Sequence, residues 1–310
     1  MRTGRPRNMS ASIKDRLLPI ARKRHEEFEL VLTRYASERF LYRLSCSAYR
    51  TSFILKGANL FALWTGDLHR ITRDLDLLGF GDPLIPRLIE IFTEVCQVTV
   101  EDDGLQFLKE TIKGEAIREE AEYNGVRITM VAMLGTSRIP VQVDIGFGDD
   151  ITPAPQEAEL PVLLDLPPAR LLVYPPETVI AEKCEAMVHL GLANSQLKDF
   201  YDLWYLSRHF DFEGQLLVKA LKATFKRRGT ILPAQIPSAL TPDYYSSSDR
   251  QSQWRAFIRK SNLIVDRAPA LEEIIGDLVP FLTPLLTAAS RGAEFDLSWS
   301  PQEKSWQPIS

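Results

Sequence analysis

The sequence predicts an α/β fold whose strands lie mainly in the first half of the chain and whose second half is mainly helical. Three observations support this prediction. A strand–turn–helix–strand unit spans residues 53–82, alternating apolar and polar residues predict strands over residues 105–145, and the pattern becomes helical from about residue 176. The chain has 310 residues, 45% hydrophobic and 25% charged, as expected for a globular protein of one large or two smaller domains.

The remaining elements follow from local patterns. Residues 12–46 are predicted to be helical because apolar residues recur at three- and four-residue steps, and residues 84–98 are predicted to form another helix after Pro83. Hairpin turns are indicated at Asn124-Gly125 and at the Gly-Thr-Ser sequence of residues 135–137.

Charge and cysteine content exclude several classes of protein. The net charge of −4 argues against a protein that coats nucleic acid over its whole surface. The basic N-terminus lacks an apolar segment and no run of 18 apolar residues occurs, so we expect neither a secretion signal nor a membrane span, and a cytoplasmic location. Cys46, Cys96 and Cys184 lie far apart, which predicts buried thiols in a reducing compartment rather than disulfides or a zinc site.

Three groups of basic residues are candidates for local contacts with phosphate. The first is the segment 1–50, with twelve Lys or Arg against five Asp or Glu. The others are Lys219, Lys222, Lys226, Arg227 and Arg228, and Arg250, Arg255, Arg259 and Lys260. Clustered cations on a mildly acidic protein suit a local contact with a nucleic acid backbone. The alternative is that each group is the solvated face of a helix.

Asp74 and Asp76 are the strongest candidates for a metal site. They lie one residue apart on a predicted strand, and alternate residues of a strand point to the same face. Two carboxylates on a sheet packed into a core need a partner that offsets their desolvation, and Mg²⁺ is such a partner. Two Mg²⁺ ions can clamp the attacking and leaving oxygens of an in-line displacement.

The strand before this pair leads into a glycine turn. The apolar run 53–55 is followed by Lys56, Gly57 and Ala58 and then by a helical pattern. A glycine at such a corner lets backbone N–H groups approach phosphate oxygens. Arg70, Thr72 and Arg73 flank the carboxylates, and the basic residues among them either bind a triphosphate or balance the local charge.

Asp144 is the candidate third carboxylate. It lies on an apolar strand of residues 141–146, and if that strand neighbours the Asp74/Asp76 strand the three acids come together. Asp144 would then complete the metal site or accept the proton of the attacking hydroxyl. The alternative is an aspartate at the end of a strand that faces solvent.

The helical half supplies a candidate cation. Pro175-Pro176-Glu177 predicts a helix start, and Lys183 in this helix lies one turn from apolar neighbours. Its ammonium would bind a triphosphate and stabilise pyrophosphate as it leaves. The alternative is a lysine paired with neighbouring glutamates. Asp199 and Asp202 share a helix face, where they either orient Lys183, contact substrate or form structural ion pairs.

Five motifs together resemble the AbiEii/AbiGii and MenT-type nucleotidyltransferase toxins. They are LKGA at 55–58, RxTxDLDLL at 70–78, VDIGFGD at 143–149, AEKxEAM at 181–187 and KDFYDLWYL at 198–206. The likeness extends to ERFLYRLS at 38–45 and TFKRRGT at 224–230, so it covers most of the chain. Each motif alone is weakly specific, whereas their joint order and spacing are fairly specific.

The resemblance implies a polymerase-β-like nucleotidyltransferase core with a mixed sheet and a mainly helical C-terminal domain. It also implies Mg²⁺, with Mn²⁺ as an alternative, and an NTP substrate. By position, Asp74 and Asp76 match the metal-binding pair, Lys183 the catalytic lysine, and Asp199 or Asp202 the later acidic motif. Known members are toxins of type IV toxin–antitoxin or abortive-infection systems, and some add nucleotides to the 3′ end of tRNA. An antitoxin and RNA are therefore the expected partners.

The glycine turn departs from the pattern of many nucleotidyltransferases. It reads Gly57-Ala58 where they have Gly-Ser, so the serine hydroxyl that would contact a phosphate is missing. Backbone N–H groups, Asn59 or Thr72 are the candidate replacements.

We expect an N-terminal helical segment over residues 1–50, a nucleotidyltransferase core over 51–170 and a helical C-terminal domain over 171–310. The expected activity is metal-dependent transfer of a nucleotide from an NTP to an acceptor hydroxyl, with the 3′ end of tRNA favoured. Two alternatives remain, nucleotidylation of a protein side chain and a non-catalytic module that binds an NTP or an antitoxin.

Overall fold

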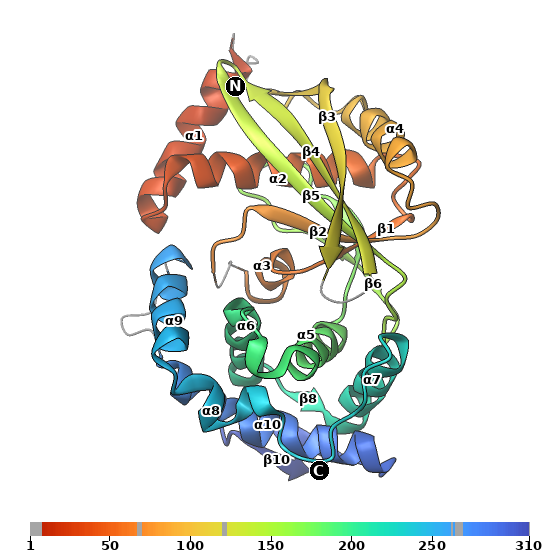
Figure 1. The fold of residues 1–310 in the computed structure, drawn as a ribbon. Coiled ribbons are helices and arrows are strands. Elements are labelled where there is room, and N and C mark those ends of the chain that lie inside the picture. Colours follow the sequence, from red (N-terminus) through yellow and green to blue (C-terminus); the bar gives the residue numbers. More distant parts are fainter. Residues whose placement is uncertain (1–7, 67–69, 120–122, 262, 264–268, 310) are drawn as a thin grey trace. The chain divides into compact units, whose positions relative to one another are not determined.

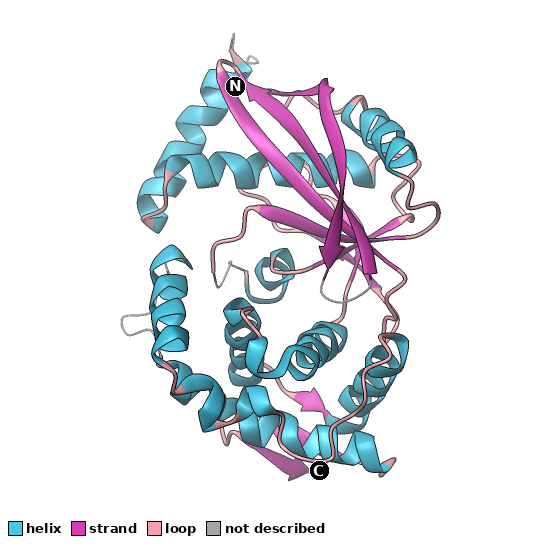
Figure 2. Cartoon of the chain, in the orientation of Figure 1, coloured by secondary structure: helices cyan, strands magenta, loops and turns pink. Residues whose placement is uncertain are grey.

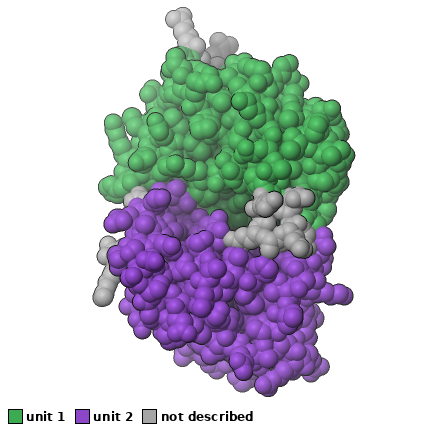
Figure 3. Space-filling model, viewed as in Figure 1, with its two compact units in different colours: residues 1–68, 72–148, 157–173 green, residues 69–71, 149–156, 174–310 purple. Residues whose placement is uncertain are grey.

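The computed structural model describes residues 8–66, 70–119, 123–261, 263 and 269–309. The chain divides into two compact units (Figure 3). Unit 1 comprises residues 1–68, 72–148 and 157–173, and unit 2 comprises residues 69–71, 149–156 and 174–310. The division into three segments expected from the sequence stays a prediction.

Unit 1 is built on a mixed sheet of seven strands, in the order β3-β4-β5-β2-β1-β7-β6 (Figure 2). β2 pairs in parallel with β5, and β1 in parallel with β7, whereas the pairs β1–β2, β3–β4 and β4–β5 are antiparallel. The strands are β1 Phe53–Lys56, β2 Asp74–Gly79, β3 Leu105–Glu119, β4 Tyr123–Leu134, β5 Ser137–Phe147, β6 Gln156–Glu159 and β7 Arg170–Val173. The predicted α/β class with a mixed sheet is confirmed.

Four helices complete unit 1, and two of them pack on one face of the sheet (Figure 1). Phe92 stacks on Phe40 at 5.4 Å between ring centroids and meets Phe53 of β1 edge-on at 5.7 Å. These contacts place α2 and α4 on the face to which Phe53 points. The helices are α1 Met9–Arg24, α2 Phe28–Ser45, α3 Asn59–Thr65 and α4 Ile85–Cys96.

The continuous helix expected over residues 12–46 is broken in the structure. His25 adopts a left-handed backbone conformation with φ of 52° and ends α1, and its N–H caps the helix by pointing to the carbonyls of Ala21 and Arg22. The apolar spacing on both sides of the break is helical, which is why periodicity alone did not reveal it.

One of the two expected hairpin turns is wrong. Asn124 and Gly125 lie inside β4, where they pair with Arg118 and Ile117 of β3, so this dipeptide does not form a turn. The second is confirmed, since Leu134 pairs with Ser137 across a tight turn in which Gly135 has φ of 62°. The pairing of long strands thus overrode a local turn preference at the first position.

The two faces of the sheet differ in polarity. On the α2/α4 face, the side chains from the four central strands are apolar and fully buried. They include Leu55, Leu75, Leu77, Val143, Ile145 and Ile128. Residues between them point to the opposite face, and there Asp74, Asp76 and Asp144 lie. Alternation along the strands therefore separates the hydrophobic core from a polar face.

Unit 2 is mainly helical, as predicted. A three-stranded sheet in the order β10-β9-β8 accompanies the helices. α5 begins at Pro176, where the proline pair predicted a helix start. The elements are α5 Pro176–Leu190, α6 Leu197–His209, β8 Phe212–Glu213, α7 Gly214–Arg227, α8 Pro242–Tyr245, α9 Ser248–Ser261, α10 Leu271–Arg291, β9 Leu297–Ser300 and β10 Ser305–Pro308, with short 3₁₀ turns at Gly191–Ala193 and Ser238–Leu240.

α10 is the core helix of unit 2. Within the described chain it is the one helix long and apolar enough to cross a membrane by length and composition. Its apolar residues are buried against other elements of unit 2, however, including Phe281, which stacks on Trp306 of β10 at 5.9 Å.

The three cysteines are free thiols. Cys184 is buried, and burial raises its pKa to about 12. Cys96 is half-buried and Cys46 is exposed, so the prediction of buried thiols is wrong for Cys46. Cys46 follows the end of α2, where the helix reaches the surface.

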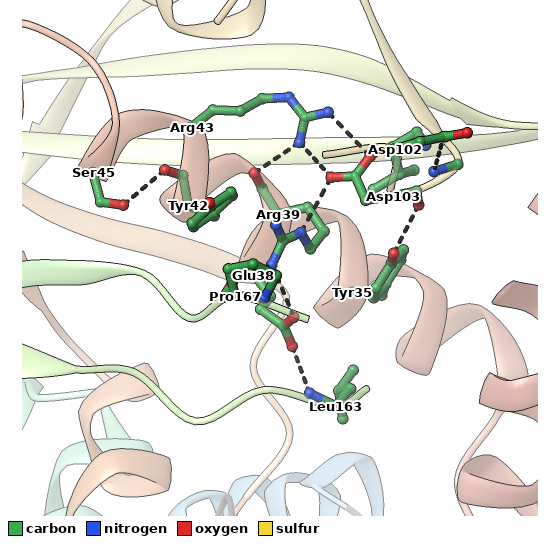
Figure 4. A network of polar contacts seen from close by, with 12 residues as sticks. Tyr35, Glu38, Arg39, Tyr42, Arg43, Ser45, Asp102, Asp103, Leu163 and Pro167 are labelled. Atoms are coloured by element: carbon green, nitrogen blue, oxygen red, sulfur yellow. Dashed lines mark hydrogen bonds and ion pairs between the residues drawn. The ribbon is translucent and has the colours of Figure 1, made fainter. Parts of the chain in front are cut away.

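A buried ionic network ties α2 to the loop before β3 (Figure 4). Asp103, only 2% exposed, accepts hydrogen bonds from Arg39 Nε at 3.1 Å and from Arg43 Nη1 at 2.7 Å. Arg39 also donates to the carbonyl of Pro167 at 2.7 Å, and the hydroxyl of Tyr35 donates to the Asp103 carbonyl. The network joins segments of unit 1 that are 60 residues or more apart in the sequence.

Glu38 lies next to this network, and its raised pKa leads us to expect that the stability of the protein falls as pH rises. Burial raises the pKa of Glu38 from 4.5 to about 7, against smaller opposing effects of the Leu163 N–H, Arg39 and Arg34, while Asp103 reinforces the rise. Between pH 4.5 and about pH 7, the folded chain binds more protons than the unfolded chain, so the free energy of unfolding falls as pH rises. We expect Glu38→Gln to be more stable than wild type by about 3 kcal/mol at pH 8, and by much less at pH 5.

Urea denaturation of both proteins at the two pH values measures this difference. Glu29→Gln, an exposed substitution on the same helix, serves as the control and should track wild type at both. A stability difference between Glu38→Gln and wild type that does not change from pH 5 to pH 8 would contradict the prediction.

Candidate functional site

Charged residues form a row across the polar face of the unit 1 sheet. Asp76 of β2 is the register partner of Lys56 in β1 and of Asp144 in β5, and Asp144 is in turn the partner of Arg127 in β4. Register partners on neighbouring strands point to the same face, with their Cβ atoms about 5 Å apart. The row continues to Glu115 of β3. Cations thus flank two adjacent carboxylates in the middle of the sheet.

Asp74 lies two residues before Asp76 on β2, so it projects from the same face of the sheet. The side chain of Asn59 donates a hydrogen bond to the Asp74 carbonyl at 2.9 Å, and the Thr72 hydroxyl lies 3.4 Å from the same oxygen. The sequence makes both residues candidate replacements for a phosphate-binding serine. In the structure they fix the backbone from which the first carboxylate projects.

Gly57 is in close contact with the second carboxylate. Its φ is 77°, a conformation that favours glycine, and a Cβ at this position would overlap Oδ2 of Asp76. The turn after β1 therefore lies directly against the Asp76 side chain. Ala58 follows, and α3 begins one residue later.

Asp144 is held by Arg127. The guanidinium donates from Nε to Oδ1 at 2.8 Å and from Nη2 to Oδ2 at 2.9 Å, and Gln142 Nε2 lies 3.3 Å from both oxygens. Hydrogen bonding to Asp144 raises the pKa of Arg127, and the nearby charge of Asp74 adds to the rise. Such paired N–H···O contacts to a carboxylate fix geometry as well as charge.

The donor set fits a metal ion held by two carboxylates. Mg²⁺ is commonly bound by one or two carboxylates together with waters and substrate phosphates, so Asp74 and Asp76 suffice. Among the described residues no group of three or more Asp, Glu, His or Cys side chains is arranged to hold a metal. Both oxygens of Asp144 accept hydrogen bonds from Arg127. Its place as a third ligand stays a prediction.

A pocket of about 510 Å³ lies beside Asp74. It is formed within unit 1 by β4, β5 and the start of α2, and Arg73, Arg138, Thr129 and Gln142 contribute to its wall. Pockets of this size accommodate small organic ligands. Glu27 and Glu29 of the α2 end line it as well, so the pocket offers cations, carboxylates and hydrogen-bonding groups next to the carboxylate strand.

The candidate lysine lies in an ionic cluster of unit 2. Lys183 is paired with Asp199 and lies 2.9 Å from Oδ2 of Asp202. Burial alone would lower the pKa of Lys183, but the two carboxylates outweigh burial and hold it above its usual value. Arg70 donates two hydrogen bonds to Asp202, at 2.7 and 2.8 Å. The acidic residues thus hold Lys183, one of the arrangements expected from the sequence, and Asp202 also binds Arg70, which the sequence did not indicate.

Arg228 does not belong to an exposed basic patch. It is a half-buried residue whose guanidinium contacts Asp149 at 3.2 Å, Glu182 at 3.5 Å and Glu185 at 3.0 Å. The suggestion that it joins Lys219–Arg227 in a contact with phosphate is therefore wrong for this residue. It binds three carboxylates of unit 2 instead.

Arg127 is the residue that sequence reasoning missed. The signal was present, because a hairpin turning at Gly135 places residue 127 opposite residue 144 when the two strands are counted back from the turn. Applying the register to the whole hairpin would have predicted an arginine beside the third carboxylate.

The comparison with protein families decides the identity of the chain. The family model described as "Nucleotidyl transferase AbiEii toxin, Type IV TA system" matches residues 39–276. This chain belongs to the AbiEii family. It is accordingly a nucleotidyltransferase toxin of a type IV toxin–antitoxin system, for which an NTP is the substrate and an antitoxin the expected partner.

Two solved structures resemble this AbiEii protein at a distance. JHP933 from Helicobacter pylori is 16% identical over 82% of this chain and 89% of its own, with a TM-score of 0.41. A protein of H. pylori described as a nucleotidyltransferase is 17% identical over 82% of this chain and 92% of its own, with a TM-score of 0.42. No curated protein matched the chain.

Proposed function

We propose that this AbiEii protein transfers a nucleotide from an NTP to the 3′ end of tRNA, with release of pyrophosphate. The observation that carries the proposal is the placement of Asp74 and Asp76 on one face of β2, with the Gly57 turn directly against Asp76. This arrangement sets two carboxylates beside a backbone turn that a phosphate chain can approach.

Asp74 and Asp76 would hold Mg²⁺, or Mn²⁺ in its place. Bound there, the metal would supply charge stabilisation for the phosphate undergoing substitution and for the leaving pyrophosphate. Asp144 would complete the site or accept the proton of the attacking hydroxyl. In either role Asp144 would use lone pairs that the two hydrogen bonds from Arg127 leave available.

The remaining predicted residues would bind the triphosphate. Lys56, Gly57 and Ala58 form the turn beside Asp76. Lys183 and Arg70 are cations, and their ion pairs with Asp199 and Asp202 fix their positions. An oriented ammonium or guanidinium favours the charge that develops on pyrophosphate. Thr72 would act indirectly, because its hydroxyl lies near the Asp74 carbonyl.

The choice of tRNA as acceptor rests on the family resemblance and on the chemistry of the pocket beside Asp74. Arg73 and Arg138 in its wall would attract the phosphates of an RNA end, while Glu27 and Glu29 lie in the same wall and would repel them. Nucleotidylation of a protein side chain is the second candidate, since a serine or tyrosine hydroxyl is chemically equivalent as acceptor. A cytoplasmic location follows if tRNA is the substrate.

The test is incubation of the purified protein with each labelled NTP, Mg²⁺ and total tRNA. We expect label that is lost on ribonuclease treatment, resists protease, requires the divalent cation and is absent with Asp76→Ala and strongly reduced with Lys183→Ala. Label that resists ribonuclease and is lost to protease would replace RNA by a protein acceptor. No transfer to either would leave an NTP- or antitoxin-binding module.

A further inference from the structure

A second pocket of unit 1 lies on the face of the sheet opposite to the carboxylates. It has a volume of about 110 Å³ and is lined by α2, by α3, by β1 and β2, and by residues 160–163. Leu55 and Leu75 form its floor, and they point away from Asp74 and Asp76 because strand residues alternate. The proposed reaction makes no use of this pocket.

Two charged side chains of the pocket have polar atoms without a hydrogen-bond partner among the described residues. Glu38, with 9% of its side chain exposed, accepts the Leu163 N–H through Oε2 at 2.8 Å, while its buried Oε1 accepts no hydrogen bond (Figure 4). Arg39 Nη1 lies 3.9 Å from Oε1. Arg34 binds Glu26 through Nη2 at 3.1 Å, and its buried Nη1 makes no hydrogen bond.

Oε1 of Glu38 is thus an unsatisfied acceptor, and Nη1 of Arg34 is an unsatisfied donor. Arg34 and Glu38 are four residues apart on α2, so their side chains are neighbours on one face of the helix. A buried polar atom without a partner costs free energy, and a ligand that satisfies it regains that energy on binding. Arg24 also lines the pocket. The free acceptor of Glu38 and the free donor of Arg34 suit a ligand that presents an N–H next to an oxygen or nitrogen acceptor.

The volume of the pocket and the chemistry of its walls limit the choice of ligand further. A cavity of about 150 Å³ holds one benzene ring, so this pocket suits a single ring and not a nucleotide. Its apolar walls, including Leu41, Ala62 and Val162, suit the faces of a flat ring. We propose that the pocket binds a single-ring nitrogen heterocycle of the pyrimidine type, with its N–H donating to Glu38 and the adjacent acceptor receiving a hydrogen bond from Arg34.

This site is separate from the nucleotide site yet adjoins the same strand. Leu75, in its floor, lies between Asp74 and Asp76, and Asn59, in its wall, donates to the Asp74 carbonyl at 2.9 Å. A bound ring would contact the two residues that support the first carboxylate. Binding of a free base in this pocket would therefore act directly on the strand that carries Asp74 and Asp76.

The experiment is calorimetric titration of the full-length protein with uracil and with cytosine at pH 8, with toluene as an apolar ring of similar size. We expect millimolar or tighter binding of at least one base and none of toluene. Glu38→Gln and Arg34→Lys should each weaken binding about tenfold or more, the loss of one charge-assisted hydrogen bond. Ala62→Leu, which fills the pocket, should abolish binding, and Glu29→Gln on the same helix should leave it unchanged.

Two features keep the result interpretable. Glu38→Gln is expected to be more stable than wild type at this pH, so its loss of binding cannot reflect unfolding. Asp76→Ala should bind the base normally, so failure of nucleotide transfer and failure of this site are distinguishable. The proposal is overturned by no binding to the wild type, by unchanged affinity in Ala62→Leu or Glu38→Gln, or by toluene binding as tightly as the bases.

Discussion

Asp76→Asn is expected to slow nucleotide transfer by roughly a thousandfold while leaving the fold intact. Asparagine has the size of aspartate but not its charge, so the variant keeps the contact with Gly57 and loses a metal ligand. A metal that stabilises developing charge is worth several kcal/mol, and each 1.4 kcal/mol or so is a factor of ten in rate. The loss should appear in kcat at saturating NTP and acceptor.

Single-turnover transfer assays with a labelled NTP measure this effect. Asp165→Asn, an exposed aspartate of the same unit, is the matched control and should transfer at the wild-type rate. Urea midpoints of both variants should lie close to that of wild type. Retention of more than about a tenth of the wild-type rate in Asp76→Asn would remove this residue from the metal site.

Asp103→Ala is expected to destabilise the protein by about 3–5 kcal/mol. The substitution leaves Arg39 and Arg43 buried, with exposed fractions of 0% and 5%, and without the carboxylate that both of them bind. Breaking a buried ion pair from one side costs this much because the remaining charge is neither solvated nor paired. The hydrogen bond from the Leu105 N–H to Asp103 is lost as well.

The difference in free energy of unfolding is measured by urea denaturation. Asp102→Ala removes a neighbouring exposed carboxylate that accepts a hydrogen bond from the Gly104 N–H, and should cost about 1 kcal/mol or less. Replacing Asp103, Arg39 and Arg43 together by leucine or methionine should recover most of the loss, because no charge then remains buried. A cost below about 1 kcal/mol for Asp103→Ala would show that water reaches the two arginines.

The parts of the structure predicted from the sequence are those governed by short-range periodicity. Period-two spacing placed Asp74 and Asp76 on one face, and the apolar strand around residue 144 placed Asp144 next to them, as the β2–β5 register shows. The roles of these residues stay predictions. Helical spacing in the same way indicated that Asp199 and Asp202 could orient Lys183.

The parts that were missed depend on contacts between distant segments. The Asn124-Gly125 signal is a strong hairpin turn locally, but the long pairing of β3 with β4 places it inside a strand. Likewise, nothing near Arg39 or Arg228 in the sequence shows that each binds carboxylates dozens of residues away. Charge clusters read from a linear sequence cannot distinguish a solvated side chain from one neutralised in a tertiary contact.

The row of charges across the polar face also constrains how the sheet can assemble. Shifting β2 by a single residue against β5 would turn its aspartates toward α2 and α4 and bury them against Phe40 and Phe92, while exposing Leu75 and Leu77. Such a misaligned sheet would carry unpaired ions in its core and would not persist. The carboxylates proposed for catalysis therefore also disfavour the wrong strand register during folding. A chain whose hydrophobic core has formed correctly has its carboxylates on the polar face.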